Sequence, residues 1–204
     1  MSPRSAFETA YDVPRETMAS FDIYAQLLTS WQLRMNLVGP GTLPDIWQRH
    51  FSDSAQLFAL AGTGRNWLDI GAGAGFPGLV IALLDPGARL TLVESISKKC
   101  HFLEAVTAAL GLGERVTIEN RRVETLPRQK FDIITARALA ALDQLLDWAL
   151  PYAGSGTRWL LPKGARVDAE LAIAIDRFAF DYSLVPSRTD DAARIVVASG
   201  VKRR

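Results

Sequence analysis

The sequence has few of the residues that would place it outside the cell or around a metal ion. Cys100 is its one cysteine, so no disulfide can form within the chain, and with two histidines it lacks the ligand clusters of a structural zinc site. No apolar run approaches the ~20 residues that span a bilayer, and residues 1–5 do not begin a signal segment. A net charge of +1 argues against a generally basic nucleic-acid-binding surface. These absences favour a cytosolic protein without a metal or a membrane anchor.

Apolar sequence, by contrast, is plentiful. With 204 residues, 49% of them hydrophobic, the chain can bury one substantial core. Repeats and low-complexity segments are absent. We expect one domain in two parts, an N-terminal helical cap over residues 1–64 and an α/β core over residues 65–204, and we expect a monomer.

The cap is predicted from helical spacing. Phe21, Tyr24, Leu28 and Trp31 recur on one face of a helix that begins near Val13-Pro14 and ends before Gly39-Pro40-Gly41. Two further helical stretches are expected around Ile46-Trp47 and over residues 54–60. Such an arrangement would cover one face or edge of a sheet.

The stretch from Asn66 to Leu84 predicts a nucleotide-binding corner. The apolar run Asn66–Ile70 is typical of a buried strand, and Leu79–Leu84 of the helix that follows a glycine loop. Glycines let a ligand approach bare backbone, and a helix start offers free N–H groups. Gly73-x-Gly75-x-x-Gly78 matches the dinucleotide fingerprint, whereas Asp69 before the loop better suits S-adenosylmethionine, which carries a sulfonium and no pyrophosphate. The loop itself leaves both cofactors open.

Strands and helices alternate along the rest of the chain. Strands are expected over residues 89–94, 115–120, 131–136 and 157–161, with helices over 97–110, 139–150 and 167–177. Residues 181–186 and 193–198 are two strands with only a loop between them. The pattern predicts an α/β fold with a mostly parallel seven-stranded sheet and a C-terminal antiparallel hairpin. No length remains for the substrate domain of a dehydrogenase, which favours methyl transfer.

Residues at the carboxyl ends of the strands are the candidate site, because ligands of open α/β sheets bind there. In the cofactor half, Glu94 is expected to accept hydrogen bonds from ribose hydroxyls, with pairing to Lys98 or Lys99 as the alternative. Val123 and Glu124 suit the adenine edge, or Glu124 is simply an acid at a helix start. Asp69 and the loop glycines, Gly71 and Gly73 among them, would hold the methionine part.

The later strand ends are basic. Arg122, Arg137 and Lys163 would place a positive patch beside the cofactor, as expected for a polynucleotide substrate, although each of them can equally be a solvated side chain. His50 is expected to be structural, with an RNA or cofactor-edge role as the alternative. Phe76 would either lie along the cofactor or pack under the loop.

The segment after the fourth strand lacks an element used to methylate exocyclic amines. Such enzymes commonly have Asn/Asp-Pro-Pro-aromatic at this point, whereas this chain has Thr135-Ala136-Arg137-Ala138-Leu139. Cys100 has no second catalytic cysteine, which argues against methylation at pyrimidine C5. Guanine N7 needs neither device, because its lone pair lies in the ring plane and no proton is lost on attack.

Taken in order, several short motifs resemble those of the bacterial small-subunit ribosomal RNA guanine-N7 methyltransferases, also called glucose-inhibited division protein B. The motifs are Asn36-Leu37-Val38, Arg49-His50 with Asp53-Ser54, Leu68 to Pro77, Arg122-Val123-Glu124, Ala136-Arg137-Ala138 and Leu161-Pro162-Lys163-Gly164. The resemblance covers residues 24–198.

The resemblance implies a class I, Rossmann-like methyltransferase that uses S-adenosylmethionine. Its implied target is guanine 527 of 16S rRNA, and the substrate is naked RNA, an assembly intermediate or the small ribosomal subunit. By matching position it implies cofactor contacts at Gly71, Phe76, Val123-Glu124 and Arg137, and functional importance for Arg122 and Arg137. Many members have another residue in place of Phe76. A nicotinamide-dependent oxidoreductase and a non-enzymatic RNA-binding assembly factor are the alternatives.

Overall fold

A seven-stranded sheet organises the chain, for which a computed structural model describes residues 1–204. The strand order is β3-β2-β1-β4-β5-β7-β6, and β7 alone runs opposite in direction to the other six strands. This confirms the mostly parallel sheet and the C-terminal hairpin. The strands are β1 (Asn66–Ile70), β2 (Arg89–Glu94), β3 (Val116–Asn120), β4 (Phe131–Thr135), β5 (Ala153–Lys163), β6 (Phe178–Pro186) and β7 (Arg194–Arg203).

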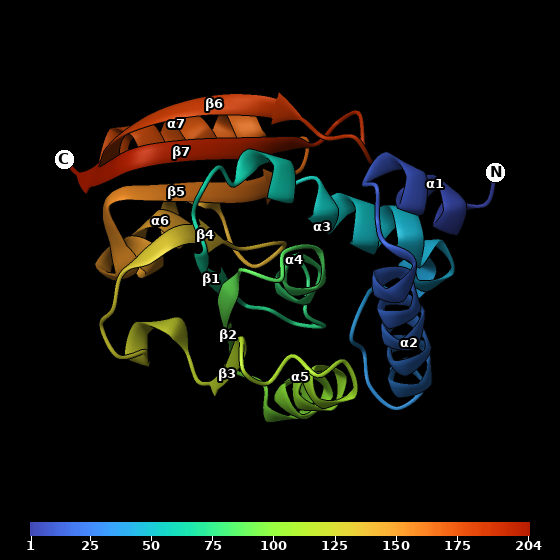
Figure 1. Ribbon diagram of the computed structural model, residues 1–204. Helices are drawn as coiled ribbons and strands as arrows, with labels where there is room; N and C mark the ends of the chain where they lie inside the picture. The colour runs from blue at the N-terminus through green and yellow to red at the C-terminus, as the bar shows by residue number, and fades with distance from the viewer.

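Helices cover both faces of the sheet (Figure 1). On one face lie α4 (Gly78–Leu84) and α5 (Ser97–Ala109), with the long α2 (Arg15–Gln32) packed outside them. On the other face lie α6 (Leu142–Ala149) and α7 (Val167–Arg177), which contact one another. Each parallel strand therefore returns to the sheet through a crossover, and the carboxyl ends of β1 to β5 meet at one edge.

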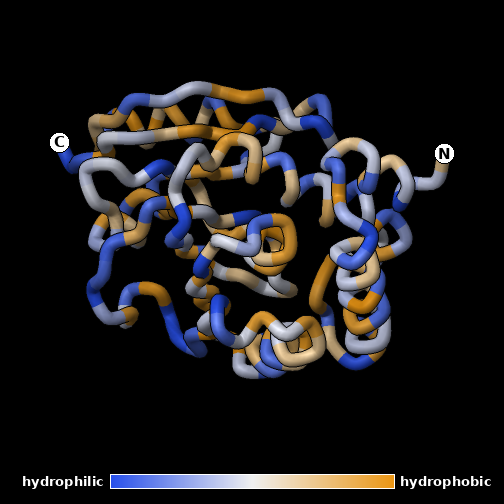
Figure 2. The backbone as a smooth tube through the Cα atoms, in the orientation of Figure 1, coloured by the Kyte–Doolittle hydropathy of each residue, from blue (hydrophilic) through white to orange (hydrophobic).

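The apolar run of β1 supplies both halves of the core. Trp67 and Leu68 are both fully buried, yet Trp67 belongs to the cluster under α4 and the cap, whereas Leu68 belongs to the cluster under α6 and α7. Successive side chains of a strand point to opposite faces, so a strand buried on both faces reads as a continuous apolar run. In the tube of Figure 2, α4 at the centre of the molecule is almost entirely hydrophobic, as its burial requires.

The N-terminal helices are more broken than the sequence suggests. Helix α1 (Pro3–Ala10) precedes α2, and α2 is followed by 3₁₀ helix η1 (Pro40–Asp45), π-helix η2 (Trp47–Ser52), the short α3 (Asp53–Ala55) and 3₁₀ helix η3 (Phe58–Leu60). Pro40 and Pro44 both fall within η1, where neither can donate a backbone hydrogen bond. Instead of two regular helices, residues 40–60 form a succession of short 3₁₀, π and α helices. No helix of the structure combines the length and the apolar character needed to cross a membrane.

An aromatic cluster fixes this segment to the rest of the molecule. Phe51 packs edge-on against Phe21 and Trp47, with ring centroids 5.1 and 4.9 Å away, and lies 5.4 Å from Tyr24. Tyr24 in turn stacks on Phe76 of the glycine loop at 5.4 Å. The helices before β1 therefore share one core with the sheet and hold residues 49–53 beside the carboxyl ends of the strands.

Candidate functional site

A cavity of about 760 Å³ lies at the carboxyl ends of the parallel strands. It is bounded by the glycine loop after β1, by the segments after β2, β3, β4 and β5, and by residues of η1, η2 and the β6–β7 loop. The expected site residues that line it are Gly71, Gly73, Phe76, Glu94, Arg122, Val123, Glu124, Arg137 and Lys163. Asp69 does not line it.

The glycine loop depends on backbone conformations that side chains would strain. Gly71 and Gly75 have φ values of 68° and 88°, in the left-handed region. A Cβ at Gly75 would also lie 2.5 Å from Leu79 Cδ1 and 2.6 Å from the Tyr24 hydroxyl. Tyr24 donates its hydroxyl hydrogen bond to the Ala74 carbonyl at 2.5 Å. The cap and α4 thus hold the loop from beneath, and residues 71–74 of the loop line the cavity.

Asp69 lies under the loop, and its side chain has no exposed surface. Its Oδ2 accepts the Gly78 N–H at 2.9 Å, while its Oδ1 has no hydrogen-bond partner. Burial raises the pKa of Asp69 to about 7, although the Gly78 hydrogen bond and the Arg137 charge act in the opposite direction. We therefore revise the expected ligand contact of Asp69, because its carboxylate supports the loop and the first turn of α4 from below.

This position of Asp69 also discriminates between the two cofactors left open by the sequence. In dinucleotide-binding folds the pyrophosphate occupies the helix N-terminus that follows the glycine loop. Here a carboxylate of the chain already accepts the Gly78 N–H at the start of α4. An internal acid at this helix start disfavours a pyrophosphate and is compatible with a cationic sulfonium ligand.

Replacing Gly78 by alanine is expected to destabilise the fold. The new Cβ would lie 2.3 Å from Leu92 Cδ2 and 2.8 Å from Asp69 Oδ2, so α4 would have to move away from β2. Overpacking of this kind costs about 1–3 kcal/mol. Urea denaturation should show the loss, whereas Gly113→Ala, whose Cβ would meet nothing within 4 Å, should not differ from the parent. Equal stability of the two variants would contradict the close packing.

Glu94 ends β2 with its carboxylate directed at the loop. Its Oε2 accepts the Gly73 N–H at 3.0 Å and its Oε1 accepts the Ile96 N–H at 2.8 Å. Each carboxylate oxygen has a second acceptor position, so the two backbone bonds orient the group without saturating it. Neither Lys98 nor Lys99 forms an ion pair with it within 4.0 Å, so the alternative pairing expected from the sequence does not form.

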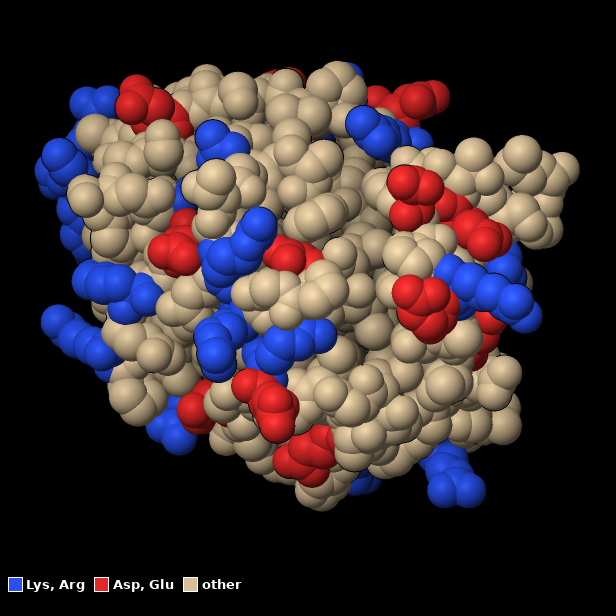
Figure 3. Space-filling view, in the orientation of Figure 1, with Lys and Arg blue, Asp and Glu red and all other residues tan.

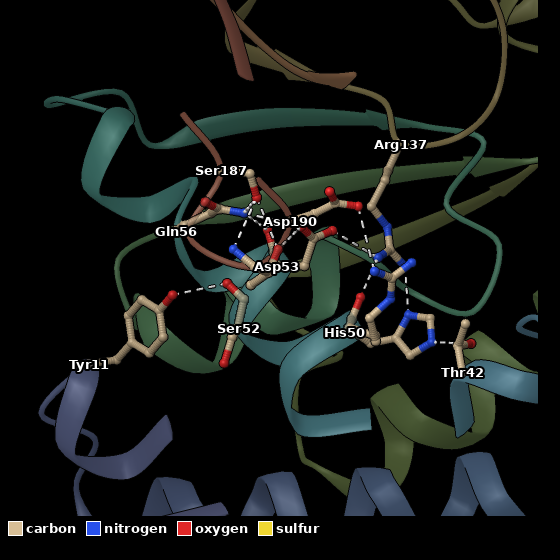
Figure 4. A network of polar contacts seen from close by, with 11 residues as sticks. Tyr11, Thr42, His50, Ser52, Asp53, Gln56, Arg137, Ser187 and Asp190 are labelled. Atoms are coloured by element: carbon tan, nitrogen blue, oxygen red, sulfur yellow. Dashed lines mark hydrogen bonds and ion pairs between the residues drawn. The ribbon is translucent and has the colours of Figure 1, made fainter. Parts of the chain in front are cut away.

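Arg137, just after β4, is fixed by residues of the N-terminal segment (Figure 4). Its Nη1 donates to Asp53 Oδ2 at 3.1 Å and to the Arg49 carbonyl at 3.2 Å. Its Nη2 lies 3.1 Å from His50 Nδ1, and its guanidinium carbon lies 5.0 Å from the centre of the Phe76 ring. The side chains of Arg137 and Asp53 are only 18% and 20% exposed, so this is a largely desolvated ion pair and not a solvated arginine.

His50 is a neutral link in this network. Burial, followed by the charges of Arg137 and Arg49, lowers the pKa of His50 to about 3. A guanidinium can only donate, so Nδ1 accepts and Nε2 carries the proton, which it donates to Thr42 Oγ1 at 2.8 Å. The Thr42 hydroxyl donates onward to the Gly39 carbonyl at 2.8 Å. His50 thus orients Arg137 and has no free nitrogen with which to act as a base. This agrees with the structural role expected for it.

The β6–β7 loop joins the same network through residues that the sequence did not single out. Asp53 Oδ1 accepts the Thr189 hydroxyl at 2.7 Å and the Gln56 side-chain amide at 3.1 Å. Gln56 also donates to Ser187 Oγ and accepts the Arg188 N–H (Figure 4). The contacts of Asp53 and Gln56 with the β6–β7 loop join positions more than 130 residues apart. Of these residues only Asp53 was part of a motif in the sequence, the one from Arg49 to Ser54.

Two further expected site residues have other partners than anticipated. The Phe76 ring is 3% exposed and stacks between Tyr24 and His50, the latter at 4.9 Å, so it packs under the loop. Lys163 is 8% exposed, and its Nζ lies 2.9 Å from Glu170 Oε2 and 2.6 Å from the Ala140 carbonyl. We therefore revise its expected role in steering RNA, because a buried, paired ammonium organises the neighbouring loop.

The segment after β3 is the exposed part of the site. The Arg122 side chain is 70% exposed and lies 3.8 Å from Glu124, whereas Val123 is buried and its carbonyl accepts the Tyr152 hydroxyl. Basic and acidic side chains are mixed on the face of the molecule drawn in Figure 3, in keeping with the low net charge. Arg122 is thus an exposed positive charge at the cavity, in a solvent-accessible ion pair with Glu124.

Comparisons with known proteins agree with this geometry. Residues 17–191 match the family described as rRNA small subunit methyltransferase G. Proteins named ribosomal RNA small subunit methyltransferase G from Methylorubrum populi and Methylorubrum extorquens are 47% and 46% identical, each over 98% of this chain and 96% of the relative. Among solved structures, a ribosomal protein L11 methylase from Lactobacillus delbrueckii aligns with a TM-score of 0.55 at 19% identity, covering 74% of this chain and 78% of its own.

A further solved structure, the S-adenosylmethionine-dependent O-methyltransferase of Thermotoga maritima, aligns with a TM-score of 0.58 at 18% identity and covers 87% of this chain and 71% of its own. At such identities the likeness concerns the fold, which is the class I methyltransferase fold expected from the motifs. The near full-length match to the family and the high identity of the relatives show which family the chain is part of. The chain belongs to the rRNA small subunit methyltransferase G family.

Proposed function

We propose that this protein transfers a methyl group from S-adenosylmethionine to N7 of a guanine in 16S rRNA, at position 527 by the resemblance of its motifs. Membership of the rRNA small subunit methyltransferase G family supports the reaction and the kind of RNA. The observation that carries the proposal is the juxtaposition, in one cavity, of an open glycine loop, the Glu94 carboxylate and the arginines after β3 and β4. The reaction would take place in the cytoplasm, where ribosomal RNA is modified.

The residues present fit the donor. The loop backbone at Gly71 and Gly73 would receive the methionine part, Glu94 the ribose hydroxyls, and the Val123-Glu124 segment the adenine edge. The acid under the loop and the absence of a free helix start suit a sulfonium better than a pyrophosphate. When bound, the donor supplies an electrophilic methyl group.

Guanine N7 is a methyl acceptor that requires no catalytic base from this cavity. Its lone pair attacks without loss of a proton, so no general base is required. His50, with a pKa lowered to about 3 and both nitrogens bonded, is not available as one. Catalysis would rest on proximity and orientation, which a fixed Arg137 and a rigid loop provide. Because the methylated ring becomes cationic, arginines would contact O6 or phosphate rather than N7.

Arg122 is expected to contribute to RNA binding through its charge. Replacing it by alanine should lower RNA affinity and reduce the slope of log K against log salt by about 1, as for one lost phosphate contact. Affinity for S-adenosylhomocysteine should stay unchanged. Arg89→Ala, which removes an exposed arginine at the opposite ends of the strands, is the matched control and should leave the slope as it is. Equal slopes for both variants would contradict this role.

The proposed function is tested by tritium transfer from labelled S-adenosylmethionine to small-subunit rRNA, offered as naked RNA, assembly intermediates and intact subunits. We expect incorporation into at least one of them, and calorimetric binding of S-adenosylhomocysteine but not NAD. Tight NAD binding would favour an oxidoreductase. Donor binding or RNA binding without transfer to any substrate would favour a non-enzymatic assembly factor.

A further inference from the structure

The loop between β4 and α6 is held in an unusual conformation from both sides. Ala138 has a φ of 53°, which non-glycine residues rarely adopt. On one side Arg137 is bonded to Asp53 and His50. On the other side Lys163 Nζ donates to the Ala140 carbonyl at 2.6 Å. Two anchored points therefore enclose a strained residue, and the surrounding structure maintains that strain.

Glu170 of α7 secures the second anchor. Its Oε2 accepts the Leu142 N–H at 2.8 Å and lies 2.9 Å from Lys163 Nζ. It therefore fixes the first turn of α6 and orients the ammonium that holds Ala140. The start of α6 at Leu142, and not at residue 139 as helical spacing predicts, leaves Leu139 in the loop.

Leu139 is presented into the cavity by this loop. It is 42% exposed, although it is a large apolar side chain, and it lines the cavity. Its two methyl carbons lie over the glycine loop, each 2.8 Å from where a Cβ of Gly71 would be. Exposing a leucine side chain to water is unfavourable. The side chain of Leu139 occupies the space beside Gly71 that a Cβ at position 71 would need.

The cavity offers few other apolar surfaces to a planar ligand. Ile96, 49% exposed, is the other exposed large apolar residue that lines it, and it lies two residues after Glu94, on the expected ribose side. Of the aromatic residues that line it, Phe76 is 3% exposed and offers no free face, while Trp148 is half-buried and lies on α6, outside the loop that carries Leu139. Ile96 follows β2 and Leu139 follows β4, on either side of β1 in the sheet, and Leu139 is on the side that carries Arg137.

We propose that Leu139 is a substrate-contact residue, against which the face of the target purine packs during methyl transfer, with Glu170 as the positioning residue of its loop. The inference rests on the proposed function and deepens it, because it assigns the base-contacting side chain. The strained loop sets Leu139 beside Gly71, next to the methionine part of the donor site, where an unstacked base must lie to be methylated. An aliphatic side chain there packs against the flat ring and excludes water without contacting its polar edge.

The test compares Leu139→Ala with Ile96→Ala in the full-length protein. S-adenosylhomocysteine affinity is measured by calorimetry, and kcat and KM for the RNA substrate are measured at saturating donor. We expect Leu139→Ala to lower kcat/KM for RNA about 10-fold, the size of effect of a lost apolar contact in a pocket, with donor affinity unchanged. Ile96→Ala should instead weaken donor affinity. Leu139→Met, which keeps the apolar bulk, should retain most of the activity.

Several outcomes would overturn the assignment. If Leu139→Ala weakens donor affinity as much as Ile96→Ala does, the side chain belongs to the donor site; if it changes neither quantity, the leucine only covers the loop. Glu170→Gln keeps an acceptor for the Leu142 N–H but leaves the buried Lys163 ammonium without its charged partner, so it should lower the melting temperature as well as kcat. Donor affinity should stay equal to that of Leu33→Ala, an 87% exposed control outside the cavity, and an unchanged kcat well below the melting temperature would contradict the positioning role. Failure of the proposed function has a different result: the unsubstituted protein would then bind the donor but methylate no RNA.

Discussion

Replacing Arg137 by alanine is expected to lower kcat/KM for rRNA methylation by ~100-fold or more, equivalent to about 2.7 kcal/mol of transition-state stabilisation. The guanidinium lies at the cavity in one orientation, because Asp53, His50 and the Arg49 carbonyl each hold one of its N–H groups. A group fixed before the substrate arrives loses no orientational freedom during the reaction. Methyl transfer assays at saturating donor measure the effect.

Removing this arginine should also lower stability. Asp53 would be left as a poorly solvated carboxylate without its partner, at a cost of about 1–3 kcal/mol, less than for a fully buried pair because both side chains retain some exposure. Asp53→Asn, which keeps an acceptor for Arg137, should have a smaller effect on both activity and stability.

Arg65→Ala is the matched control for these variants. Arg65 pairs with Asp85 at 2.9 Å, but it does not line the cavity. It should therefore leave kcat/KM unchanged. A loss of activity in Arg65→Ala equal to that in Arg137→Ala would show that stability alone explains the effect, and would contradict a role for Arg137 at the site.

Replacing Asp69 by alanine is expected to give the second large effect, a loss of donor affinity together with a loss of stability. The Gly78 N–H would remain buried without an acceptor, which costs about 1–3 kcal/mol, and the glycine loop would lose its support from below. Calorimetry with S-adenosylhomocysteine and urea denaturation measure the two losses. Asp69→Asn keeps the acceptor and should retain most of the donor affinity.

The Asp69 variants also predict a dependence on pH. The pKa of Asp69 is raised in the fold from 3.8 to about 7, so the stabilising contribution of the protonated form is complete below about pH 4 and is lost as the pH rises through 7. Asp69→Asn does not titrate. The free energy of unfolding of the parent should therefore fall relative to Asp69→Asn between pH 5 and pH 8, by on the order of 2–4 kcal/mol. A constant difference between the two proteins over this range would contradict the raised pKa.

The α/β core could be predicted closely from the sequence because its signals are local. The run Arg89–Glu94 carries the buried apolar residues Leu90, Leu92 and Val93 and forms β2 over the residues predicted. The hairpin at the end of the chain also forms, with longer strands than predicted. Residues 40–60 were less predictable, because Pro40, Pro44 and the surrounding packing replace helical periodicity by 3₁₀ and π turns.

The site could be predicted as a set of strand ends but not as a set of contacts. Sequence places Glu94 and Arg137 at one edge of the sheet, where the structure has them. It does not reveal that Lys163 is neutralised by Glu170 of the next helix, or that Asp53 lies 84 positions from the arginine it binds. Such partners are set by tertiary packing, and they decide whether a strand-end charge is free to meet RNA or is used to hold the loop in place.

Mapping the modified nucleotide tests the central claim most directly. Ribosomal RNA from cells with and without the gene is treated with borohydride and aniline, which cleave RNA at N7-methylguanine, and the cut sites are located by primer extension. The account predicts one cleavage in 16S rRNA, at guanine 527, that is present with the gene, absent without it, restored by the parent protein and not by Arg137→Ala. An unchanged cleavage pattern between the two strains, or a gene-dependent methyl group on another atom or in another RNA, would contradict it.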